Sequence, residues 1–138
     1  MTTPDATSAP AASAEPVGTL ASVSIDCPDP SALADFYAPL LGMRRAYARP
    51  DGSVIALAGG GVWVTLMRVD DYEPPTWPKP GQAQQMHLDV AVRDLPAAVD
   101  RAVALGAREA DHQPMPDVWR VLLDPAGHPF CLTTAGAD

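Results

Sequence analysis

His87 is the residue of this sequence that is best placed to do chemistry. It opens an alternating stretch, His87-Leu-Asp-Val, that also contains Asp89. A histidine in a strand can act as a general base or contact a ligand, and it can equally be a structural residue hydrogen-bonded to Asp89 or Ser22. We take His87 as the best single catalytic candidate. His112 and His128 lie in proline-flanked loops, which favours surface positions.

The elements that must position His87 form an internal repeat. Residues 22–29 and 87–94 are both alternating segments that end at an aspartate able to cap a helix. Each is followed by an apolar pattern with helical spacing that a glycine ends, over residues 30–42 and 96–106. The chain therefore predicts one strand and one amphipathic helix in each of two copies.

Three further short strands complete each copy. Residues 43–47 and 107–110 predict the first of them, and hairpins follow over residues 53–67 and 119–132. The prediction is an α+β fold of two tandem βαβββ modules.

The domain boundaries follow from the repeat. Module 19–68 is joined to module 86–134 by a proline-rich connector, 69–85, and a tail of Ala, Pro, Ser and Thr over residues 1–18 is expected to be disordered. Trp77 in the connector either pins it to the surface or lies at a site mouth.

The first strand of each module has one apolar and one polar face. The polar faces carry Ser22, Ser24 and Asp26 in one copy and His87 and Asp89 in the other. We expect curved mixed sheets around a shared cleft lined by these faces, with the helices outside. The alternative is that the polar faces are simply solvated sheet surface.

Net charge and cysteine content limit the classes of binding partner and the cellular compartment that we expect. A net charge of -8 with an isoelectric point near 4.6 argues against nucleic acid or an anionic membrane, and no apolar run is long enough to span a bilayer. Cys27 and Cys131 make no secreted disulfide framework, and the start of the chain lacks an export signal. We therefore expect a cytoplasmic protein.

Several stretches resemble a known family. They are His87-Leu-Asp-Val with Asp94, Ala104-Leu-Gly-Ala107, Arg120-Val-Leu-Leu-Asp-Pro-Ala-Gly-His-Pro-Phe-Cys-Leu132 and Pro74-Pro-Thr-Trp-Pro78. Over roughly residues 20–134 the chain resembles the vicinal oxygen chelate (VOC) superfamily of glyoxalases, bleomycin resistance proteins and dioxygenases. It looks most like the glyoxalase-like branch common in actinobacteria.

The resemblance implies four metal-ligand points, one on the first and one on the last strand of each module. By the repeat register these fall at Ser22, Thr65, His87 and Cys131, and only His87 is a typical ligand. We therefore expect no metal cofactor. Trp63 and Met67 share the strand face of Thr65 and add apolar surface, so the expected ligand-binding residues are Ser22, Ser24, Trp63, Thr65, Met67, His87, Asp89 and Cys131.

Three functions remain open. The first is a protein that binds a small aromatic or cyclic molecule in the cleft, like the drug-sequestering members of the family. The second is a lyase, isomerase or dioxygenase that uses His87 as base or as the surviving metal ligand. The third is an interaction module without a ligand. The edge strands of two four-stranded modules also predict a homodimer.

Overall fold

The first module is a four-stranded sheet covered by one helix. The computed structural model describes residues 20–84 and 86–134, so the predicted tail, residues 1–18, lies outside the described part. The first module comprises β1 (Ser22–Cys27), α2 (Pro30–Leu41), β2 (Arg44–Ala48), β3 (Val54–Ala58) and β4 (Trp63–Arg68). The strand order is β1-β4-β3-β2, with β1 parallel to β4 and the other pairs antiparallel.

The second module repeats this plan. It comprises β5 (Leu88–Ala91), α3 (Leu95–Leu105), β6 (Arg108–Glu109), β7 (Trp119–Leu123) and β8 (Pro129–Thr133), in the strand order β5-β8-β7-β6. The parallel pair is again formed by the first and last strands of the module. The structure confirms the predicted α+β fold of two βαβββ modules.

Local sequence explains both helices. The carboxylate of Asp29 accepts hydrogen bonds from the backbone N–H groups of Ser31 and Ala32, and Pro30 occupies the first turn, where no N–H is needed. Gly42 ends the helix with φ 65°, a left-handed conformation that favours glycine. Asp94 caps α3 in the same way through the N–H of Ala97.

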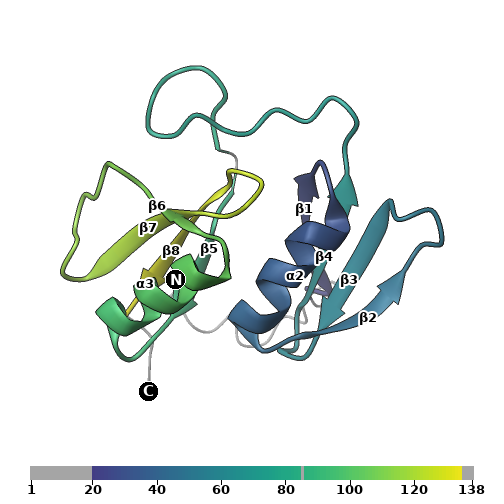
Figure 1. Ribbon diagram of the computed structural model, residues 1–138, viewed down its shortest axis with the longest axis horizontal. Coiled ribbons are helices and arrows are strands. Elements are labelled where there is room, and N and C mark those ends of the chain that lie inside the picture. Colours follow the sequence, from purple (N-terminus) through teal and green to yellow (C-terminus); the bar gives the residue numbers. More distant parts are fainter. Residues whose placement is uncertain (1–19, 85, 135–138) are drawn as a thin grey trace, which may run out of the picture.

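The two modules share one apolar core. In Figure 1 both helices lie toward the middle of the molecule, with β2 and β6 at opposite ends, and α2 contacts α3. The aromatic ring of Phe36 on α2 meets that of Phe130 on β8 edge to face, with centroids 5.8 Å apart. Apolar side chains from α2, α3 and both sheets belong to the same buried cluster. The relative position of the modules is therefore set by packing as well as by the connector.

The connector runs from the end of β4 to the start of β5 and crosses from one module to the other (Figure 1). Within it, Thr76 closes a small loop by accepting from and donating to the backbone of Gln82. Among the described residues, no helix has the length and apolarity needed to cross a membrane, and both cysteines are free thiols.

Candidate functional site

The open face of the first sheet, which carries no helix, combines hydroxyl and apolar side chains. The hydroxyl oxygens of Ser22 and Thr65 are hydrogen-bonded to each other at 2.7 Å. Trp63 and Met67 alternate with Thr65 along β4 and are 40% and 38% exposed. Two large apolar side chains therefore remain open to solvent on this face.

The corresponding face of the second sheet carries the reactive groups. His87 Nε2 lies 3.3 Å from Asp89 Oδ1. Asp89 on β5 is paired in register with Cys131 on β8, so their side chains share one face. The ligand atoms of His87, Asp89 and Cys131 all lie within 4.8 Å of one another, which makes them the residues here that could hold a metal ion.

The Cys131 side chain is a thiol rather than a thiolate at neutral pH. Burial, the negative charge of Asp89 and a hydrogen bond to that carboxylate together raise the pKa of Cys131 to about 11. Cys27 on β1 is shifted to about the same pKa, mainly by burial. Neither cysteine is therefore an activated nucleophile.

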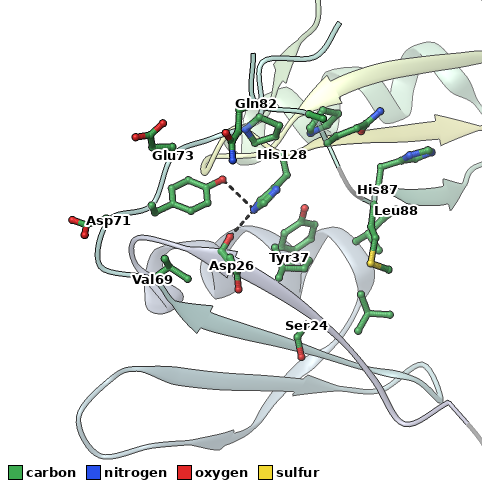
Figure 2. A pocket seen from close by; sticks show the side chains of 18 residues that line it. Ser24, Asp26, Tyr37, Val69, Asp71, Glu73, Gln82, His87, Leu88 and His128 are labelled. Carbon is green, nitrogen blue, oxygen red and sulfur yellow. Dashed lines mark hydrogen bonds between the residues drawn. The ribbon is translucent and has the colours of Figure 1, made fainter. Parts of the chain in front are cut away.

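A cavity of about 730 Å³ lies between the modules (Figure 2). Its walls include Ser24 and Asp26 from the first strand of one module, His87 from just before the first strand of the other, and Tyr37 from α2. The first strands of both modules therefore border one space, and the connector contributes a further wall through residues 69–84. A cavity of this size accommodates a small organic molecule.

A second cavity, of about 590 Å³, lies on the open face of the second sheet. Its lining includes His87, Asp89 and Cys131 together with Trp119 on β7 and Trp77 from the connector. Trp77 is half-buried and also contacts the ring of His112, with centroids 5.5 Å apart. Trp77 therefore both borders a cavity and packs against a neighbouring loop residue. His87, Gln84 and Pro129 border both cavities, which therefore adjoin.

A polar cluster that sequence reasoning missed joins the modules next to the first cavity. Asp124, in the turn between β7 and β8, is buried and accepts a hydrogen bond from the Tyr37 hydroxyl at 2.6 Å. Its other oxygen accepts from the N–H groups of Ala126 and His128. Desolvation and the charge of Asp124 raise the pKa of Tyr37, so this hydroxyl stays a donor. The sequence signal was the Asp-Pro-Ala-Gly turn, in which an aspartate caps the following N–H groups.

His128 belongs to the same cluster. Its Nε2 contacts the backbone oxygen of Asp26 (Figure 2). The same nitrogen lies 3.1 Å from the hydroxyl of Tyr72, which itself donates to the backbone oxygen of Ala126. A carbonyl oxygen only accepts, so Nε2 carries a hydrogen and donates it to Asp26. The sequence predicted only a surface position for His128. That description leaves out the contacts of its ring, which link the turn to β1 and to the connector.

The eight expected ligand-binding residues are divided between the two open faces. His87 borders both cavities, Ser24 borders the first, and Asp89 and Cys131 border the second. Ser22, Trp63, Thr65 and Met67 line neither of these cavities. The three expected residues of the second module, His87, Asp89 and Cys131, therefore lie beside one cavity. Trp77 and Trp119 line the same cavity, and Trp119 was not expected there.

Comparison with known structures supports the fold. A glyoxalase/bleomycin resistance protein/dioxygenase family enzyme from Burkholderia phytofirmans PsJN has 20% identity and a TM-score of 0.65, over 83% of this chain and 97% of that one. Lactoylglutathione lyase from Agrobacterium tumefaciens has 18% identity and a TM-score of 0.59, over 86% and 95%. TioX from Micromonospora sp. ML1 has 24% identity and a TM-score of 0.55, over 84% and 98%.

Sequence comparison assigns the family. No curated protein matches the chain. The family model of the glyoxalase-like domain matches residues 22–133, which include both modules and the connector. The chain therefore belongs to the glyoxalase-like domain family.

Proposed function

We propose that this protein binds a small aromatic or cyclic molecule in the cleft between its modules. The observation that carries the proposal is the 730 Å³ cavity bordered by Ser24 of the first module and His87 of the second. Apolar walls with a few convergent polar groups are typical of small-molecule sites. Tyr37, Leu88 and Met86 supply apolar surface to this cavity beside the polar Ser24 and His87.

We propose further that the four-ligand metal site of the family is not retained. Ser22 and Thr65 offer neutral hydroxyls already hydrogen-bonded to each other, and the pKa of the Cys131 thiol is about 11. A divalent ion needs anionic or imidazole donors to replace its hydration, and of the four points only His87 supplies one at neutral pH.

The second candidate function is an enzyme of the lyase, isomerase or dioxygenase kind with His87 as its base. The contact that favours it is the 3.3 Å separation of His87 Nε2 from Asp89 Oδ1, because a carboxylate on one ring nitrogen orients the imidazole. Turnover that is lost in His87→Gln with binding retained would establish this function.

We also propose a cytoplasmic homodimer. Trp63 and Met67 on the open face of the first sheet, and the unpaired edges of β2 and β6, are surfaces that a second copy would cover. Two free, buried thiols fit a reducing compartment. Sedimentation at micromolar concentration should give twice the 14.5 kDa chain mass, and a single 14.5 kDa species would exclude the dimer.

A thermal-shift screen combined with elemental analysis tests the proposed function. A library of aromatic and alicyclic compounds at millimolar dose should contain ligands that raise the melting temperature, because binding stabilises the folded state by RT ln(1 + [L]/Kd). Ser24→Trp should abolish the shift by filling the cavity between the modules, whereas Ser31→Trp on the exposed start of α2 should not. Stoichiometric metal that is lost in His87→Ala would overturn the metal-free account.

A further inference from the structure

The two adjoining cavities are lined by more acidic than basic side chains. The first is bordered by Asp26, Asp71 and Glu73, and the second by Asp89. Among the described residues that line them there is no lysine and no arginine, and the basic side chains are those of His87 and His128. His87 Nε2 lies 3.3 Å from Asp89 Oδ1. The four carboxylates outnumber the two imidazoles, so the potential in the cavities favours a cation over an anion.

A buried hydrogen-bond acceptor without a donor, on Gln84, also favours a ligand that carries N–H or O–H groups. Gln84 borders both cavities, and its Oε1 is buried with no hydrogen-bond partner among the described residues. A buried polar atom without a partner is costly, and a ligand N–H or O–H would recover that cost. Gln84 and Asp89 both present acceptor oxygens, so the ligand they fit carries hydrogen-bond donors.

Aromatic walls provide the apolar side of the second cavity. Trp77 and Trp119 both line it, together with Val121 and Pro129. Indole faces attract cations and pack against flat rings. An aromatic wall beside a carboxylate is a combination that selects organic cations, since a metal ion or a neutral hydrocarbon would use only one of the two.

We propose that the cavity on the second sheet binds an organic cation, a protonated amine or amidine on an aromatic or cyclic body. The body packs against Trp77 and Trp119, and the charged nitrogen faces the carboxylate of Asp89 with Gln84 Oε1 as a second acceptor. This inference rests on the proposed small-molecule function and names the charge class taken by the second cavity, which adjoins the cleft between the modules at Gln84, His87 and Pro129. It gives Asp89 the role of counter-ion rather than metal ligand.

The test compares three probes of one shape on the full chain. Calorimetric titration with 2-naphthylmethylammonium, 2-naphthalenemethanol and 2-naphthoate varies the charge while the ring stays constant. We expect the cation to bind at least tenfold more tightly than the alcohol, and the carboxylate to bind more weakly than both. Asp89→Asn should reduce binding of the cation to the level of the alcohol, because its side chain keeps the shape but loses the charge.

Asp100→Asn is the matched control. Asp100 lies exposed on α3 and lines neither cavity. Its replacement by asparagine removes the same charge from the protein as Asp89→Asn does. The tenfold preference should persist in this variant. Equal binding of the cation and the alcohol, or equal effects of Asp89→Asn and Asp100→Asn, would overturn the inference while leaving a binding function intact. If none of the three probes binds, this inference fails, and the wider thermal-shift screen decides the proposed function separately.

Discussion

The two sheets have the same strand order, but their open faces carry different side chains and have different neighbouring segments. On the first, Trp63 and Met67 are exposed and the polar pair Ser22 and Thr65 is satisfied internally. On the second, Trp77 reaches from the connector to a cavity that contains His87, Asp89 and Cys131. Duplicated modules therefore need not have equivalent open faces, and the segment between them contributes Trp77 to the cavity on the second face.

The largest effect is expected from separating the modules. Asp124→Ala leaves the buried Tyr37 hydroxyl and two backbone N–H groups without their acceptor, and should lower the free energy of unfolding by about 3 kcal/mol. Tyr37→Phe removes a single bond to the same carboxylate and should cost about 1 kcal/mol. Urea denaturation measures both, and equal small losses would show that packing alone joins the modules.

The next prediction contrasts the two exposed faces directly. Trp77→Ala should weaken binding of 2-naphthylmethylammonium by at least tenfold, because it removes an aromatic wall of the second cavity. Trp63→Ala should leave the affinity unchanged, because Trp63 lines neither cavity. Calorimetry on both variants decides the comparison, and a larger loss in Trp63→Ala would assign the ligand to the first face.

Alkaline pH should lower the stability of the protein through one cysteine in each module. The pKa of each cysteine is raised from about 9 to about 11 in the folded protein, so the folded state holds its thiol protons more tightly than the unfolded chain does. Stability should be constant below pH 9 and fall as the pH rises toward 11. Cys27→Ser and Cys131→Ser should each flatten this decline in denaturation curves recorded from pH 8 to 11. A wild-type curve without a slope would contradict the shifts.

The smallest effect is expected on the first face. Thr65→Val keeps the side-chain shape and removes the hydrogen bond to Ser22, which should cost at most about 1 kcal/mol of unfolding free energy. Ligand affinity should not change. A loss of affinity in Thr65→Val that matches the loss in Asp89→Asn would mean that both faces contact the same molecule.

The sequence predicted the fold because its local signals agree in both copies. Asp29 and Asp94 cap their helices as expected, Gly42 and Gly106 end them, and the alternating strands appear within three residues of the expected bounds. The short strand expected over residues 107–110 contains only Arg108 and Glu109. Repeated cap, helix and hairpin patterns are short-range features, which a single sequence contains in full.

The site was predicted in part. His87, Asp89 and Cys131 come together because strand alternation and the repeat register place them on one face. The Trp77 wall, the partners of His128 and the burial of Asp124 depend on how the connector folds over the modules and how the modules pack. Those are long-range contacts without periodicity. The Asp-Pro-Ala-Gly turn and the tryptophan of the connector mark Asp124 and Trp77 in the sequence, but the groups that they contact are not marked by any local pattern.

The most direct test of the account locates the bound cation by amide chemical shifts. Titration of ¹⁵N-labelled protein with 2-naphthylmethylammonium should shift the backbone signals of residues 87–91, 119–121 and 131–133 and the indole signals of Trp77 and Trp119. The signals of β1 and β4 around Ser22 and Thr65, and the indole signal of Trp63, should stay in place. Shifts centred on Trp63 and Thr65, with the second sheet unperturbed, would contradict the assignment of the binding site to the second module.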